Sequence, residues 1–258
     1  MRKLSFLWIS LLLAITVAIS GCKQEGCTDI NAVNYDPEAV EDNGNCAYPN
    51  ISLNLASVIN GSPVSYGEVY DINGVKVSFS GLQFYASGVG LGSMGEFTDF
   101  SPYLLVKADQ EVYELGEGIA GHQHMLRFHV GIDSVTNHAD PSAYAGDDPL
   151  AFQSPSMHWS WNNGYIFLRV DGLVDLDGDQ TPETTMEFHI GKDVNLTPVM
   201  LEVNKEVQTE EEAISLEIDW AKLFTGMDLT QEYVTHTGDN LPLAAKTVAN
   251  ISSMFSKK

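Results

Sequence analysis

The feature that most constrains the fold of this chain is a set of short segments in which apolar and polar residues alternate. They are Ile51–Leu55, Val75–Phe79, Leu126–Val130, Met186–Ile190 and Ile214–Ile218. A period of two residues puts every second side chain on one face of a β-strand, so each segment predicts a strand with one buried face. Glycine and asparagine turns separate the segments. From residue 50 to residue 258 the chain therefore predicts one all-β domain, a β-sandwich of the immunoglobulin-like or a related type.

One segment near the C-terminus follows a helical period instead. Ala244, Val248, Ile251 and Phe255 recur at spacings of three and four residues. This spacing predicts an amphipathic helix that covers the sheet, and Pro242 suits its first turn, where no backbone donor is needed. A shorter helical turn is expected at Trp220–Phe224.

The N-terminus carries the pattern of an export signal. Two positive residues precede an apolar run over Leu4–Ile19, and small residues then lead to Cys22. The run is too short for a membrane span, and its end resembles the lipobox of bacterial lipoproteins. Residues 1–21 are therefore expected to be removed as a signal peptide, with a lipid anchor on Cys22. The charged residues that follow resemble the export tags of surface lipoproteins in Bacteroidetes-type bacteria, so we expect an outer-membrane lipoprotein of the cell envelope that faces the exterior or the periplasm.

The two remaining cysteines, Cys27 and Cys46, predict one disulfide in an exported protein. They enclose a polar, acidic segment, so residues 22–49 are expected to form a stapled N-terminal module or linker. The whole chain has 13 Lys and Arg against 35 Asp and Glu, a net charge of −22. Such an acidic surface excludes nucleic acid as a partner and favours cations and basic proteins.

A second acidic segment has the composition of a cation-binding loop. Asp175, Asp177 and Asp179 lie two residues apart and Glu183 follows, with a glycine and a proline between them. Carboxylates at such spacings surround a hard cation with oxygen ligands, as calcium loops do, although the order of residues departs from the full EF-hand pattern. We therefore predict calcium at these four residues; a solvated acidic hairpin is the alternative.

A series of short motifs runs through the domain in a definite order. The most specific are Gly131-Ile132-Asp133-Ser134 and the stretch MHWSWNNGY at 157–165, and the others lie at 79–85, 103–106, 137–141 and 188–191. The series resembles the MbnP-like family, the copper-binding proteins of the methanobactin operon. The resemblance implies an exported β-sandwich that binds copper for acquisition or handling and has no catalytic turnover. It also implies that a tryptophan, Trp159 or Trp161, is oxidised to kynurenine by a partner di-haem enzyme of the cytochrome c peroxidase type.

Histidines inside these motifs are the candidate copper ligands, because imidazole binds copper in either oxidation state. The candidates are His138, His158 and His189. The loops of a sandwich gather at its ends, where residues distant in sequence can meet. Alternation places His189 on the non-core face of its strand together with Glu187, where we expect it to be exposed. The alternative is that each histidine is only a hydrogen-bonding surface or loop residue.

A second choice for copper is the pair His122 and His124. In a strand both rings would project to the same side, and such a pair chelates copper or zinc. Leu126 and Phe128 continue that face, which favours the alternative that His124 is a partly buried residue at the rim of the sheet.

The runner-up function is a cell-surface module that binds a glycan or a partner protein and carries structural calcium. Exposed Trp159, Trp161 and Tyr165 would form its stacking platform. The sequence contains no Gly-x-Ser-x-Gly elbow and no Gly-rich phosphate loop. Pairs of carboxylates carry little information in so acidic a chain, and we do not expect an enzyme.

Overall fold

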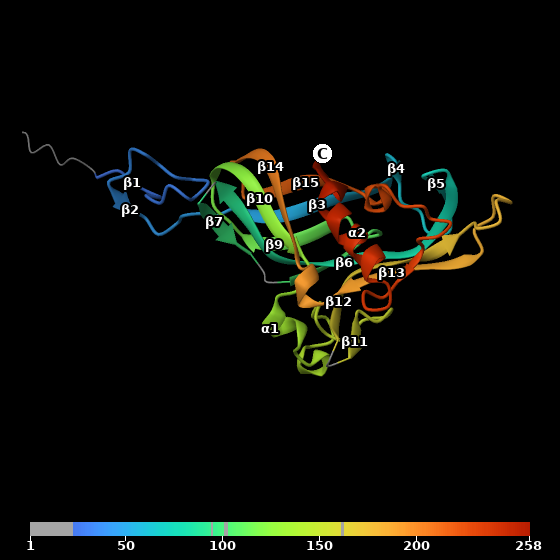
Figure 1. The fold of residues 1–258 in the computed structure, drawn as a ribbon. Coiled ribbons are helices and arrows are strands. Elements are labelled where there is room, and N and C mark those ends of the chain that lie inside the picture. Colours follow the sequence, from blue (N-terminus) through green and yellow to red (C-terminus); the bar gives the residue numbers. More distant parts are fainter. Residues whose placement is uncertain (1–22, 94, 101–102, 161–162) are drawn as a thin grey trace, which may run out of the picture.

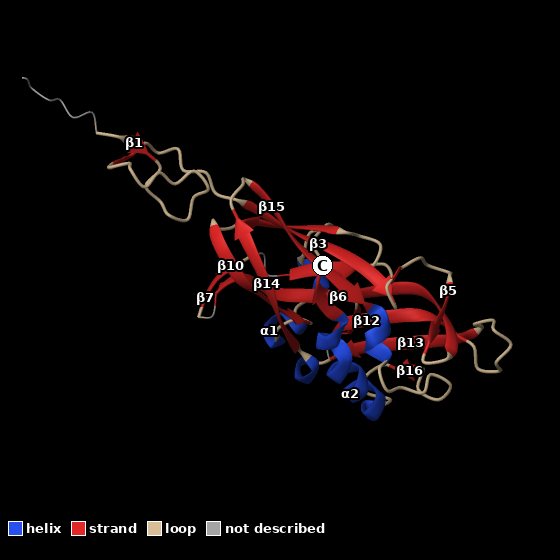
Figure 2. Ribbon diagram, turned by 90° about the horizontal axis from the view of Figure 1, so that it is seen from above, coloured by secondary structure: helices blue, strands red, loops and turns tan. Residues whose placement is uncertain are grey.

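Two stacked sheets form the body of the molecule (Figure 1, Figure 2). The structure, a computed structural model, describes residues 23–93, 95–100, 103–160 and 163–258. The strands of the larger sheet are β5 (Val69–Ile72), β6 (Val75–Ser93), β7 (Glu96–Asp99), β8 (Tyr103–Lys107), β10 (Gly121–Val130), β11 (His158–Ser160), β12 (Gly164–Val174), β13 (Thr184–Gly191), β14 (Thr197–Val207) and β16 (Val234–Thr235). Those of the smaller sheet are β3 (Asn50–Ile59), β4 (Ser62–Pro63), β9 (Val112–Glu117), β15 (Glu211–Asp219) and β17 (Phe255–Lys257).

The order of strands explains which residues become neighbours. The larger sheet runs β14-β10-β6-β12-β13-β16, and the smaller runs β17-β15-β3-β4. All five alternating segments of the sequence lie in strands, namely in β3, β6, β10, β13 and β15, which confirms the predicted all-β sandwich. Their apolar residues, such as Leu53, Phe79 and Phe188, are buried between the two sheets.

The predicted C-terminal helix is α2 (Leu241–Asn250), which packs against β13 and β16. Asn240 caps it by accepting a hydrogen bond from the backbone of Leu243, and the predicted turn at Trp220–Phe224 is a 3₁₀ helix. The helical prediction was wrong for Phe255, which begins β17 and pairs with Ile218. Its burial is the same as predicted, but the sheet edge at β15 supplies backbone partners that a longer helix would have left unpaired.

The outer face of the larger sheet is covered at one end by residues 131–160, which we call the cap (lower part of Figure 1). The cap contains α1 (Ser134–Asn137), a 3₁₀ turn at Pro141–Ala143 and β11. A second buried apolar cluster lies beneath it, formed by Tyr85, Leu105, Ile132, Leu150, Met157, Tyr165, Ile166 and Phe167. The sheet therefore has two buried faces at this end, and polar residues of the second face are enclosed.

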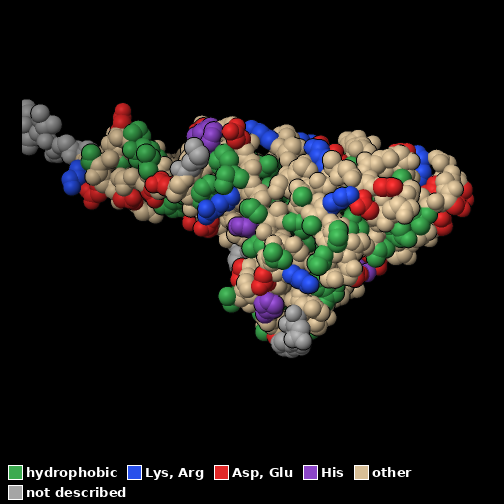
Figure 3. Space-filling model, in the orientation of Figure 1, with side chains coloured by type: hydrophobic (Ala, Val, Ile, Leu, Met, Phe, Trp, Pro, Cys, Tyr) green, Lys and Arg blue, Asp and Glu red, His purple; other side chains and the backbone are tan. Residues whose placement is uncertain are grey.

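The N-terminal module projects from one end of the sandwich (Figure 1). Its short strands β1 (Glu25–Gly26) and β2 (Glu41–Asp42) are parallel, and Cys27 and Cys46 form the predicted disulfide with an S–S distance of 2.07 Å. Acidic side chains lie along it in Figure 3. Cys22 lies outside the described residues. Within the described part of the chain, no helix has the length and apolar character needed to cross a membrane.

Candidate functional site

The densest group of polar side chains on the outer face of the larger sheet comes from β12 and β13. Alternation sends Leu168 and Val170 into the core, so Arg169 and Asp171 point outwards. The antiparallel register then sets Arg169 opposite His189 and Asp171 opposite Glu187. The pairing of two strands therefore gathers two acids, an arginine and an imidazole.

Asp171 is held by two charged or polar partners. Its Oδ1 atom lies 2.7 Å from Nε2 of His189, and its Oδ2 atom accepts a hydrogen bond of 2.5 Å from Nε of Arg169. Burial raises the pKa of the Asp171 carboxyl, but the hydrogen bonds from His189 and Arg169 outweigh this effect, so the pKa falls below its usual value. Arg169 also donates to the carbonyl oxygen of Ser156 at 2.8 Å, which ties the cap to β12.

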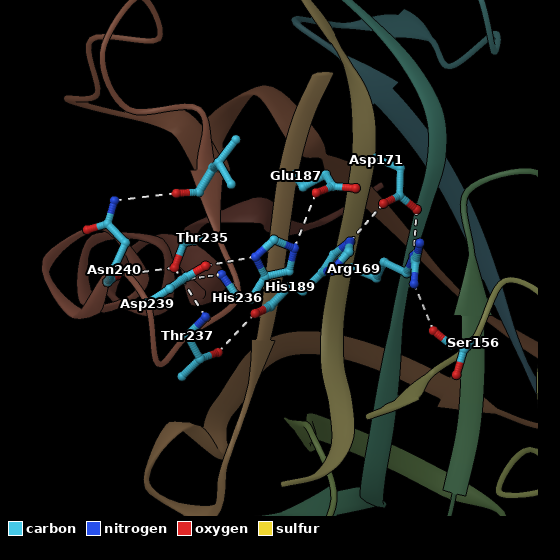
Figure 4. Close-up of polar contacts among 11 residues, drawn as sticks. Ser156, Arg169, Asp171, Glu187, His189, Thr235, His236, Thr237, Asp239 and Asn240 are labelled. Atoms are coloured by element: carbon cyan, nitrogen blue, oxygen red, sulfur yellow. Dashed lines mark hydrogen bonds and ion pairs between the residues drawn. The ribbon is translucent and has the colours of Figure 1, made fainter. Parts of the chain in front are cut away.

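His236 joins this group from the loop after β16. Its Nε2 atom lies 3.2 Å from Oε2 of Glu187, its Nδ1 atom lies 2.8 Å from Oδ2 of Asp239, and its ring centroid is 4.9 Å from that of His189. Figure 4 shows His236 between Glu187 and Asp239, with His189 beside it. We call Asp171, Glu187, His189 and His236 the imidazole cluster. Its first three members place one ligand atom each within 4.8 Å of one another.

The loop that carries His236 is fixed to β13 by the backbone and by Thr237. β16 pairs with β13 in parallel, with Glu187 opposite Val234. The Thr237 hydroxyl donates to the carbonyl oxygen of His189 at 2.9 Å and accepts from the backbone N–H of Gly191 at 3.0 Å. Sequence reasoning did not select Asp171, Glu187 or His236. The one signal in the sequence was the turn His236-Thr237-Gly238-Asp239. In it, Oδ1 of Asp239 accepts a hydrogen bond of 2.7 Å from the backbone N–H of His236.

His189 shares the outer face of its strand with Glu187, as the alternation predicted, but it is buried with 5% of its surface exposed. The expectation of exposure was wrong because a period of two residues identifies the face and not what covers it. His236 and Thr237 cover this one.

The other two predicted copper ligands lie in the cap. Nε2 of His138 is 3.4 Å from Oδ2 of Asp193. The His158 ring meets the ring of Tyr165 edge-on, with centroids 4.9 Å apart. Among the described residues, His138, His158 and His189 do not come together in one metal-sized group.

The Nε2 atom of His158 is buried and has no hydrogen-bond partner within the described chain. Burial lowers the pKa of His158, against the opposing charge of Asp140, so the ring is neutral near neutral pH. Trp159 follows it and is half-buried over Gly191, where a Cβ atom would approach the indole to 2.6 Å. Trp161 lies outside the described residues.

His122 and His124 lie at the start of β10, with ring centroids 6.1 Å apart. Nδ1 of His122 is 3.1 Å from Oε2 of Glu206. The pairing with β14 shifts register between Gln123 and Met125, and this irregularity breaks the alternation. Gln123 is consequently buried while His122 is exposed, so the pair does not share a face with Leu126.

The acidic loop brings its four predicted residues together. Asp175, Asp177, Asp179 and Glu183 place one carboxylate oxygen each within 4.8 Å of one another. Asp175 accepts backbone hydrogen bonds from Gly178 at 2.7 Å and from Gln180 at 2.9 Å, which shape the turn. Desolvation and the charges of the three aspartates raise the pKa of Glu183. Four carboxylates so close together repel one another, and a hard cation would relieve the repulsion.

Comparison with known proteins gives one family and one fold. The family model described as MbnP matches residues 48–239. Among solved structures, MbnP from Methylosinus trichosporium is similar to this chain with a TM-score of 0.58, covering 80% of this chain and 97% of that one. The two sequences are 15% identical, so this likeness shows the shared fold. No curated protein matches the sequence.

Proposed function

Because the chain belongs to the MbnP family, we propose that it is an exported copper-binding protein, anchored in the outer membrane by lipid on Cys22, that acts in copper acquisition or handling. The family is associated with copper. The net charge of −22 supports a role in binding cations. The proposed role is binding, without catalytic turnover.

The observation that carries the proposal is the Nε2 atom of His158, which is buried and has no hydrogen-bond partner among the residues that the structure describes. Buried polar atoms nearly always have partners, and leaving one unpaired costs about 1–3 kcal/mol. A metal ion on the nitrogen lone pair would remove that cost. The lowered pKa of His158 keeps the ring in the neutral form that ligates metals.

The surroundings of His158 favour Cu(I). The buried ring of Tyr165 packs edge-on against the imidazole, and burial is the main cause of the lowered pKa of His158, so the ring lies in a partly desolvated, aromatic shell. A singly charged ion loses less hydration energy in such a shell than Cu(II) would. His138 is the second ligand that we propose in the cap, since its contact with Asp193 is long and exposed. Among the described residues His189 does not come together with His138 and His158, so we do not assign it to this site.

We also propose that Trp159 or Trp161 is the residue oxidised to kynurenine by a di-haem peroxidase partner. Trp159 supports this because it adjoins His158 and is half-buried at the edge of the cap. An intact mass equal to that of the unmodified chain after co-expression with such an enzyme would contradict the proposal. Retention on a carbohydrate column that Trp159→Ala abolishes would instead support the alternative glycan-binding function.

Anaerobic titration of the mature chain with Cu(I), in competition with a chromophoric chelator, tests the copper site. His158→Ala should weaken Cu(I) binding by roughly tenfold or more, the scale at which metal sites respond to lost support. The matched control is His129→Ala, which removes a half-buried histidine of β10 that belongs to none of the proposed metal sites. Unchanged Cu(I) affinity in His158→Ala would contradict the proposal.

A further inference from the structure

The imidazole cluster contains His189, a predicted copper ligand that lies apart from the cap site proposed above, and its donor atoms differ in kind from those of the cap. The cap offers neutral imidazole in apolar surroundings, whereas the cluster combines two imidazoles with carboxylates at a solvent-accessible edge. We propose that Glu187, His189 and His236 form a second metal site, which takes a divalent transition ion of borderline hardness such as Zn²⁺ or Co²⁺. This site goes beyond the proposed copper function and does not depend on it.

Each imidazole of the cluster has one nitrogen engaged by an aspartate, and the second nitrogen of His236 faces Glu187, the third proposed ligand. Asp171 engages Nε2 of His189 at 2.7 Å, which leaves Nδ1. Asp239 engages Nδ1 of His236 at 2.8 Å, which leaves Nε2. Metal-binding histidines characteristically donate their second ring N–H to a carboxylate, which fixes the tautomer and strengthens the ligand. Both histidines therefore have the outer partners that a metal site requires.

Glu187 supplies the third donor between the two rings. Its Oε2 atom lies 3.2 Å from Nε2 of His236, and a carboxylate oxygen of Glu187 lies within 4.8 Å of a ring nitrogen of His189. The rings of His189 and His236 are 4.9 Å apart between centroids, so one ion between them can reach both imidazoles and Glu187 once the side chains rotate. Bonds from Zn²⁺ to nitrogen and oxygen are about 2.0–2.2 Å long. Two histidines and one carboxylate with an open position are a common donor set for borderline ions.

The supporting residues are rigid. Arg169 fixes Asp171 with a bond of 2.5 Å and neutralises its charge, so Asp171 orients His189 without adding a second net negative charge. Thr237 fastens the His236 loop to the His189 backbone. The geometry of the ligands is therefore set before an ion arrives.

Access is open on one side only. The side chains of His236 and Glu187 are 38% and 33% exposed, whereas that of His189 is 7% exposed. An ion can therefore enter from solvent past His236 and reach a buried ligand. Imidazole donors disfavour calcium and magnesium, which prefer oxygen.

Absorption spectroscopy of the mature chain titrated with Co²⁺, followed by displacement with Zn²⁺, tests the site. We expect saturable ligand-field bands that Zn²⁺ abolishes. His236→Asn and Glu187→Gln should each weaken Zn²⁺ binding at least about tenfold. His129→Asn, which alters a half-buried histidine of β10 that belongs to none of the proposed metal sites, is the matched control and should leave the bands unchanged.

Thermal unfolding without metal checks that each variant folds. Because two different ligands are substituted, the test still stands if one of the two variants fails to fold. Bands of equal intensity in His236→Asn, Glu187→Gln and the unsubstituted chain would overturn this inference, as would their loss in His129→Asn. His158→Ala separates the two sites, because it should lose Cu(I) and keep the Co²⁺ bands. Loss of both metals in His158→Ala with an intact fold would show that the second site is not independent.

Discussion

At the scale of single residues, surroundings give histidines of the same chain different chemistry. His158 has a buried nitrogen that no other described residue contacts by a hydrogen bond, whereas His189 and His236 each have an aspartate. The sequence predicted the motif that contains His158 and the face on which His189 lies. It could not predict Asp171 as a partner of His189, because the two lie 18 residues apart and only the pairing of β12 with β13 brings them into contact. Asp239 lies three residues from His236, so only this pair had a local signal in the sequence.

The packing of Trp159 on the sheet predicts that Gly191→Ala is destabilising. A Cβ atom would lie 2.5 Å from the carbonyl oxygen of Tyr165 and 2.6 Å from the indole of Trp159. The backbone of Tyr165 cannot easily move away from the added methyl group. The free energy of unfolding should therefore fall by about 1–3 kcal/mol, and tryptophan fluorescence should change. Gly146→Ala, where nothing lies within 4 Å, is the control for urea unfolding. Equal stability of the two variants would contradict this packing.

At the scale of elements, alternation was sufficient to predict the major strands because each buries one face in the sandwich core. Alternation failed as a predictor where strand pairing, or packing by a distant segment, determines the position of a residue. The register shift in β10 moves His122 away from the face of Leu126, and the edge of β15 recruits Phe255 into a strand. The loop after β16 carries no period at all, which is why His236 was not predicted as a ligand.

The turn between β14 and β15 depends on Glu212, which predicts a pH dependence. Burial raises its pKa, but hydrogen bonds from Lys205 and from Gln208 and Thr209 outweigh this effect and lower the pKa from 4.5 to about 2. A lowered pKa stabilises the fold above pH 4.5, and this stability is lost as the pH falls towards 2. The contribution is at most about 3 kcal/mol.

Urea unfolding at neutral and at acidic pH measures this contribution. Glu212→Gln should lower the stability at neutral pH and flatten its fall on acidification. Glu210→Gln, at the exposed neighbouring position, serves as the control. A profile of Glu212→Gln that parallels that of the unsubstituted chain would show that the turn does not depend on this carboxylate.

The acidic loop between β12 and β13 predicts stabilisation by calcium. Free calcium at about ten times its dissociation constant would add about 1.4 kcal/mol, or about 3–6 °C in melting temperature for a domain of this size. Asp177→Asn removes one of the four carboxylates and should abolish the shift in a thermal melt. Asp109→Asn, on an exposed turn, is the control. A shift that persists in Asp177→Asn would place calcium elsewhere.

At the scale of the whole molecule, three groups of potential metal ligands occupy separate parts of one acidic sandwich. The cap, the imidazole cluster and the acidic loop differ in donor type, from neutral imidazole through mixed ligands to carboxylates alone. The disulfide-bonded N-terminal module connects this sandwich to the segment around Cys22. A lipid-anchored protein of this kind would hold metal ions at a membrane surface.

The proposed anchor predicts a change of location for Cys22→Ser. Without the thiol no acyl chains can be attached, and membrane affinity falls because each buried methylene contributes about 0.8 kcal/mol. The unsubstituted protein should fractionate with outer membranes and the variant with soluble material. The Cys27→Ser and Cys46→Ser double variant, which lacks only the disulfide, should stay with the membranes. A Cys22→Ser protein that remains with the membranes would contradict the anchor.

The central claim, that His158 binds copper in the cap, is tested most directly by diffraction. Crystals of the mature chain loaded anaerobically with Cu(I) should show an anomalous peak at the copper edge beside Nε2 of His158. The same peak should be missing from crystals of His158→Ala. An anomalous peak only at the imidazole cluster, the His122 and His124 pair or the acidic loop would contradict the assignment.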